Sequence, residues 1–174
     1  MFMVIDFEAT CTNTSAFPRR EMEIIEIGAV LCNSDHNLIS SFQSFIQPVR
    51  HPILTDFCIE LTSIQQEQVN SAPKFPEVID LFLHWQDTWQ ASQAIFCSWG
   101  NFDKRILQEN CRFHAVPYPF QEHINLKKSF AKKQRCRSVG MTAALKRVNL
   151  PLSGSHHRGI DDARNIATLL PYCL

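Results

Sequence analysis

Residues 1–10 read MFMVIDFEAT, an apolar run that two acids interrupt near its end. An apolar run of this length before polar residues predicts a buried β-strand from Phe2 to Phe7. Because side chains alternate along a strand, Asp6 and Glu8 lie on one face and the apolar residues beside them on the other. The stretch therefore predicts a core strand that brings two carboxylates together.

Outward from this strand, Glu23 to Leu31 and Ile39 to Ile46 are rich in β-branched and aromatic residues and lie between polar breaks. They predict two more strands, antiparallel in succession. Later segments alternate between strand and helix patterns. Helices are predicted to begin at Thr55, after Pro73 and at Phe102, and to span Leu126–Lys133, Ser138–Val148 and Gly159–Leu170. Strands are predicted at Ala94–Trp99 and Phe120–Ile124. This order predicts an α/β fold with a mixed sheet flanked by helices.

The length and composition of the chain restrict the class of protein to which it can belong. A chain of 174 residues is long enough for one compact domain, and we expect a single domain over residues 1–174. Its 17 basic and 17 acidic residues balance, so any attraction for a polyanion must be local. Seven scattered cysteines, no basic leader and no apolar run of about 20 residues predict a cytoplasmic protein with reduced thiols and no membrane contact.

The pair Asp6 and Glu8 is the first candidate for chemistry. Two carboxylates crowded on one strand face need a cation or hydrogen-bond donors, and the segment supplies no Lys or Arg. A divalent metal is the simplest partner. Taken alone, the pair favours the simpler interpretation that Glu8 ends the strand and points into water, because acids are mostly exposed.

Two further acids occur where helices begin. Asp103 follows the strand Ala94–Trp99 at the start of a helix, where an acid also serves as an ordinary helix cap. Near the C-terminus, His157 and Asp162 stand five positions apart, and so do His156 and Asp161. Helical periodicity separates the acids, because Asp162 falls within the apolar arc of its helix and Asp161 falls opposite.

A basic stretch lies between these sites, with six Lys and Arg residues and no acid from Lys127 to Arg137. Such a stretch follows a phosphate backbone in some proteins. A solvated helix face explains it equally well, because Leu126 and Phe130 already provide a buried side.

Together and in this order, the motifs resemble those of the DEDDh exonucleases. Within that family, the resemblance is greatest to the 3′–5′ exoribonucleases of the enhanced-RNAi and histone-mRNA type. It rests on residues 6–11 (DFEATC), 98–103 (SWGNFD) and 157–162 (HRGIDD), and extends through residues 23–27 and 60–64. It thus covers essentially the whole chain.

The resemblance implies an RNase H-like fold with a five-stranded mixed sheet. It also implies two Mg²⁺ or Mn²⁺ ions held by Asp6, Glu8, Asp103 and Asp162, which are oxygen ligands suited to hard cations. Two ions about 4 Å apart activate a water and stabilise the leaving 3′ oxygen. His157 is implied as the general base.

By the same resemblance, the substrate is the 3′ end of a single-stranded nucleic acid, RNA in preference to DNA. The implied contacts to the terminal nucleotide are Phe7, Ala9, Thr10, Leu61, Trp99 and His157. Because the first catalytic strand stands at the start of the sequence, we expect no N-terminal RNA-binding extension, and any targeting partner is unknown. The alternatives are a DNA-directed 3′–5′ exonuclease and a non-catalytic regulator that binds nucleic acid or protein through the same fold.

Overall fold

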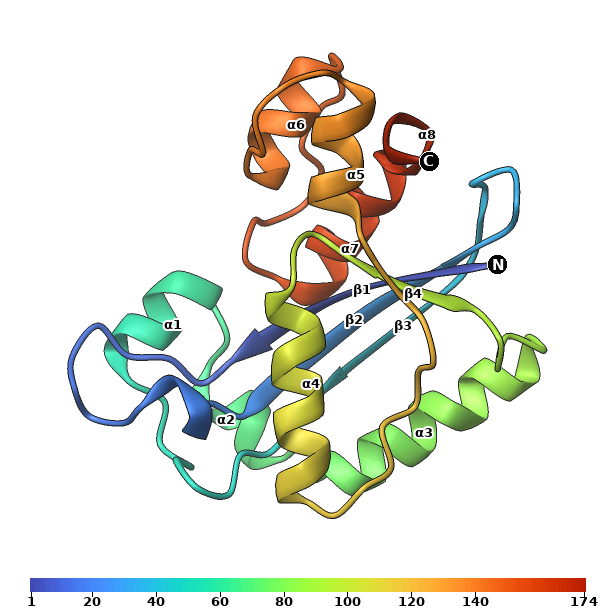
Figure 1. Cartoon of the computed structure of the whole chain (residues 1–174). Coiled ribbons are helices and arrows are strands. Elements are labelled where there is room, and N and C mark those ends of the chain that lie inside the picture. Colours follow the sequence, from blue (N-terminus) through green and yellow to red (C-terminus); the bar gives the residue numbers. More distant parts are fainter.

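A computed structural model describes all 174 residues, and a sheet forms its centre (Figure 1). This sheet has five strands. The strand order is β3-β2-β1-β4-β5. The β1–β2 and β2–β3 pairs are antiparallel, whereas the β1–β4 and β4–β5 pairs are parallel. The strands are β1 (Phe2–Ala9), β2 (Ile24–Cys32), β3 (Leu38–Phe45), β4 (Ile95–Ser98) and β5 (His123–Asn125). The mixed α/β sheet predicted from the sequence is confirmed, with β1 in the middle.

Helices cover both faces of this sheet (Figure 1). One face carries α3 (Phe75–Thr88) and α4 (Phe102–Phe113), and the other carries α5 (Leu126–Lys133), α6 (Met141–Arg147), α7 (Gly159–Thr168) and α8 (Leu170–Cys173). The short helices α1 (Asp56–Thr62) and α2 (Gln66–Asn70) stand near the carboxyl end of β1, and a 3₁₀ turn spans Arg19–Glu21. None of the helices combines the length and apolar character needed to cross a bilayer.

Alternation along β1 supplies both apolar cores. Ile5 and Phe7 are buried in the core beneath α3 and α4, whereas Val4 is buried in the core beneath α5, α6 and α7. The two acids of β1 therefore point to the face that α7 covers, as the period of two predicts.

The predicted boundaries differ from the observed ones where tertiary contacts decide them. The last strand was expected at Phe120–Ile124, but Phe120 packs against Phe82 and Phe96, and pairing with β4 begins only at His123. The helix expected from Ser138 begins at Met141, because Gly140 is still extended. The helix expected to reach Leu170 ends at Thr168, and α8 follows, with Pro171 in its first turn.

Close backbone contact fixes α7 on the sheet. A Cβ atom on Gly28 of β2 would lie 2.1 Å from the carbonyl carbon of Gly159 and from the nitrogen of Ile160. Only a glycine at position 28 lets the first turn of α7 approach β2 this closely. The helix start is thereby held beside the carboxyl end of β1.

Candidate active site

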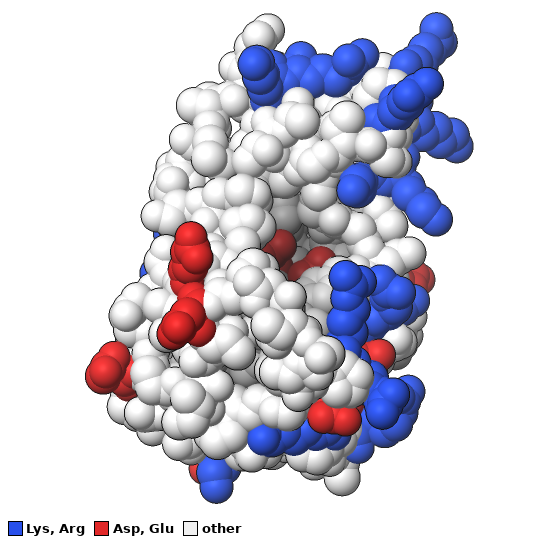
Figure 2. Space-filling view, turned by 90° about the vertical axis from the view of Figure 1, so that its left-hand side faces the viewer, with Lys and Arg blue, Asp and Glu red and all other residues white.

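A cleft of about 380 Å³ lies where the carboxyl end of β1 meets the first turns of α4 and α7. Figure 2 shows acidic side chains at the bottom of a hollow in this face. Four carboxylates line the cleft, and no Lys or Arg does: Asp6, Glu8, Asp103 and Asp162. Three segments distant in sequence thus bring together the four acids that the motifs singled out.

The acids of β1 meet the acid of α7 directly. Asp6, Glu8 and Asp162 each offer an oxygen atom, and these atoms lie within 4.8 Å of one another. Burial raises the pKa of Asp6 well above its usual range, and the charges of Asp103 and Glu8 add to the effect. Burial, followed by the charge of Asp162, raises the pKa of Glu8 to about 9. The cluster therefore resists full ionisation without a cation.

Asp103 is not an ordinary helix cap. The N-cap residue of α4 is Asn101, and Asp103 is 5% exposed, with its Oδ1 accepting the backbone N–H of Phe7 at 3.2 Å. Burial raises the pKa of Asp103 to about 6, and the hydrogen bond from Phe7 opposes that rise. This carboxylate therefore ties α4 to β1 while it faces the cleft.

Helical periodicity predicted that Asp162 is buried and that Asp161, on the opposite side of α7, is not, and the structure confirms this. Asp162 is 4% exposed and lines the cleft. Asp161 instead accepts the backbone N–H of Ser155 at 2.9 Å and pairs with Arg164 at 3.7 Å, away from the cleft.

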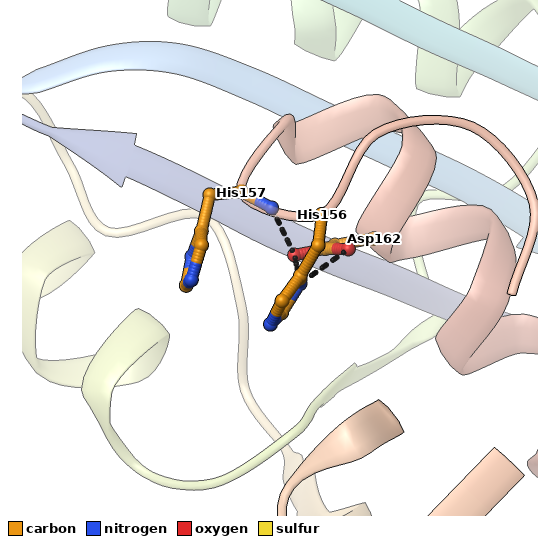
Figure 3. Close-up of side chains that lie close together, drawn as sticks. All are labelled: His156, His157 and Asp162. Carbon is orange, nitrogen blue, oxygen red and sulfur yellow. Dashed lines mark hydrogen bonds and ion pairs between the residues drawn. The ribbon is translucent and has the colours of Figure 1, made fainter. Parts of the chain in front are cut away.

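Two histidines of the loop before α7, His156 and His157, lie beside Asp162 of that helix. Figure 3 shows both rings extending to the same side of the loop. The Nδ1 atom of His156 lies 2.8 and 3.1 Å from the two carboxylate oxygens of Asp162. The backbone N–H of His157 donates to the same carboxylate at 3.0 Å. The two rings stack with centroids 3.9 Å apart, and the ring of His157 has no hydrogen bond within the protein. Burial and the neighbouring His156 lower the pKa of His157.

A buried glutamate holds the start of α7, a role that the sequence did not indicate although residues 23–27 carry part of the resemblance. Glu26 of β2 is fully buried, and its Oε2 accepts the backbone N–H of Gly159 at 3.0 Å and the Nε–H of Arg158 at 3.1 Å. Its Oε1 accepts the side-chain amide of Gln43 at 3.0 Å. Glu26 lies within an unbroken buried strand, so the apolar pattern concealed it.

Most of the residues expected to touch the terminal nucleotide lie in the cleft, namely Phe7, Ala9, Leu61, Trp99 and His157. The Phe7 side chain belongs to the opposite core, so only its backbone faces the cleft. Thr10 is not among the lining residues, because its hydroxyl accepts the backbone N–H of Glu23 at 2.9 Å and its side chain is buried. Met22, Phe102 and Met141 also line the cleft, a position that the sequence did not indicate for any of them, although Phe102 belongs to the motif at residues 98–103.

The donor set suits hard divalent cations. The cleft offers carboxylate oxygens from four acids, which are the ligands that Mg²⁺ and Mn²⁺ prefer. Crowded and buried carboxylates with raised pKa values lack a compensating positive charge from the protein. Asp6, Glu8, Asp103 and Asp162 therefore fit such ions chemically.

Comparison with known proteins extends over nearly the whole chain. Residues 3–170 match the RNase_T exonuclease family model. Human ERI1 exoribonuclease 3 is 34% identical over 97% of the chain and 52% of its own length, and human ERI1 exoribonuclease 2 is 33% identical over 96% and 27%. The chain thus spans about half or less of these relatives.

A solved structure gives the same result for the fold. The nuclease domain of 3′hExo, a DEDDh family member bound to rAMP, superimposes with a TM-score of 0.90 at 31% identity, covering 97% of this chain and 88% of that one. The implied RNase H-like fold of the DEDDh exonucleases is confirmed. The chain belongs to the RNase_T exonuclease family and, within it, to the DEDDh 3′–5′ exonucleases that include the ERI1 exoribonucleases.

Proposed function

We propose that this chain is a 3′–5′ exonuclease that uses two divalent cations to release nucleoside 5′-monophosphates from single-stranded nucleic acid, with RNA preferred to DNA. The observation that carries the proposal is the convergence of Asp6, Glu8, Asp103 and Asp162 on one cleft that contains no basic side chain. Two bound cations would neutralise these acids and stabilise negative charge on the phosphate in the transition state.

The residues of the chain then have separate tasks. His157 accepts the proton of the attacking water, because its ring has no partner in the protein and a lowered pKa keeps it neutral near pH 7. Its stacking on His156 limits the orientations that the ring adopts. Leu61 and Trp99 border the space for the terminal base and sugar, and such apolar contacts accept any base.

The preference for RNA is supported by the relatives. ERI1 exoribonucleases 2 and 3 are named for activity on RNA, and the 3′hExo nuclease domain was solved with rAMP. Another solved relative, 29% identical with a TM-score of 0.89, concerns recognition of the 3′ end of a histone mRNA stem-loop. We therefore expect a free RNA 3′ end as the substrate.

The test uses 5′-labelled single-stranded RNA and DNA of one sequence, incubated with Mg²⁺, Mn²⁺ or a chelator. We expect a ladder that shortens from the 3′ end, requires a metal, proceeds faster on RNA and disappears in Asp162→Asn. A faster ladder on DNA would reverse the proposed preference. No ladder from a folded protein that still binds the strand would instead support a non-catalytic binding module.

A further inference from the structure

The cleft continues into neighbouring grooves. A groove of about 580 Å³ shares Cys11, Met22 and Phe102 with the cleft, and its other walls include Phe17, Arg19 and Phe57. A smaller depression of about 140 Å³ shares Phe102 with the cleft and Arg19 with the groove, and adds Arg20 and Arg105. A continuous path therefore leads away from the four acids.

Three aromatic rings line this path, and one of them, Phe17, stacks on His51 with ring centroids 4.0 Å apart. Phe102 is 42% exposed although it is the first residue of α4 and adjoins the buried Asp103. Phe57 of α1 is half-buried on the same groove, and neither ring stacks on another aromatic side chain. Exposed aromatic rings in a groove are the usual stacking platforms for the bases of single strands.

Three arginines from two segments accompany these rings. Arg19 and Arg20 precede β2, Arg105 lies on α4, and all three are exposed without forming an ion pair with an acid. One acid, Glu109, shares their depression. Figure 2 shows Lys and Arg side chains grouped immediately beside the hollow that holds the acids. These positive charges therefore lie close enough to the cleft to contact the phosphates of a strand whose 3′ end is bound there.

The basic run identified in the sequence lies near the cleft, since Trp99 of the cleft packs on Phe130 within the run, but it does not line the cleft. None of its residues, from Lys127 to Arg137, lines the cleft or the grooves joined to it. Lys133 instead donates to the backbone carbonyls of Pro171 and Leu174, where it holds the C-terminal turn. This run serves as the comparison surface for the arginines.

We propose that Phe17, Arg19, Phe57, Phe102 and Arg105 form an entry groove for the nucleotides immediately 5′ of the one being removed. The inference rests on the proposed function, because it assigns the upstream part of the same strand. Phe57 and Phe102 stack on bases, and Arg19 and Arg105 neutralise phosphates. The occupant is single-stranded, because stacking on these rings requires unpaired bases.

The test compares a strand with a substrate that fills the cleft alone. The strand is a single-stranded RNA of about ten nucleotides, and the small substrate is the p-nitrophenyl ester of uridine 5′-monophosphate, in which nitrophenol replaces the upstream strand. For Arg19→Ala/Arg105→Ala we expect KM for the strand to rise about tenfold and its log–log salt slope to fall by about 1.4. Hydrolysis of the ester is unchanged.

Two matched variants separate the contributions. Lys128→Ala/Lys132→Ala removes the same charge from exposed positions of the other basic surface, and we expect it to leave KM for the strand unchanged. Phe57→Ala removes a ring but no charge, so it weakens strand binding at least about fivefold while the salt slope stays the same. Equal effects of the arginine and lysine pairs, or a parallel loss of ester hydrolysis, would overturn the entry groove.

Fluorescence anisotropy with a labelled strand in chelator keeps the two proposals distinguishable. If the wild-type protein hydrolyses neither substrate, the proposed function fails, and strand binding still decides the groove. Weaker binding by the arginine pair than by the lysine pair then supports the groove, and equal binding by both pairs overturns it.

Discussion

The carboxylate of Asp103 has two separable roles. Its Oδ1 accepts the Phe7 N–H, and its charge faces the other acids of the cleft. Asp103→Asn retains an acceptor oxygen but removes the charge, so we expect a folded protein whose rate of 3′-end hydrolysis falls at least about 100-fold. Steady-state rates measure the role of the charge, and melting temperatures measure the role of the hydrogen bond.

Asp103→Ala is the matched variant, because it removes the charge and the acceptor together. It should be equally inactive but melt at a lower temperature, since the buried Phe7 N–H then has no partner. Identical melting of the Asn and Ala variants would show that the hydrogen bond does not tie α4 to β1.

His157 and His156 offer a direct comparison of adjacent imidazoles. The ring of His157 is free, whereas that of His156 is held by Asp162. We expect His157→Ala to reduce kcat by about 100- to 10,000-fold, and His156→Ala to reduce it far less. Because the pKa of His157 is lowered and the neutral ring is the base, the rate should fall in acidic solution and reach half its maximum below pH 6.5. Equal reductions of kcat in the two variants would contradict the assignment of His157 as the general base.

At the scale of the element, α7 depends on one buried ion pair. Arg158 contacts Glu26 at 3.1 Å, and the pair flanks the hydrogen bond from Gly159 to the same carboxylate. Arg158→Ala leaves a buried charge with fewer partners, so we expect a loss of about 3 kcal/mol in the free energy of unfolding, measured in urea. Arg164→Ala, on the same helix but paired with Asp161 at 3.7 Å and half exposed, should cost less than about 1 kcal/mol.

The elements also differ in how far the sequence predicts them. The β1 and α5 segments were predictable because apolar periodicity alone determines them, and the predicted bounds of α5 match the structure. The short β5 was misplaced, since pairing with β4 rather than local propensity selects its residues. Glu26 was concealed inside a buried strand, and Arg19 and Arg105 come from separate segments, so no local run of charge reveals their proximity.

At the scale of the whole molecule, the acidic cleft makes stability depend on pH and metal. The pKa of Glu8 rises from 4.5 in the unfolded chain to about 9 in the fold, so folding favours its protonated form. This contribution is fully present below pH 4.5 and is lost as pH rises towards 9. In chelator, we therefore expect the protein to melt several degrees lower at about pH 8.5 than at about pH 5.5.

Glu8→Gln should reduce that difference and raise the melting temperature at alkaline pH, whereas Glu60→Gln, at an exposed position, should change neither. Mg²⁺ or Mn²⁺ should raise the melting temperature of the wild type at alkaline pH, because binding to the native state stabilises it. The same ions should have less effect on Glu8→Gln. A pH dependence that persists undiminished in Glu8→Gln would place its origin elsewhere in the molecule.

The position of α7 along the chain has a consequence for biosynthesis. A ribosome that has completed β5 has already produced three of the four clustered acids, but Asp162 and both histidines emerge only with residues 156–162. Under the proposed function, the RNA nearest to the nascent polypeptide is its own message. Because the last ligand and the base are translated together and after the other three acids, a nascent chain that ends before α7 has no complete catalytic centre with which to attack that message.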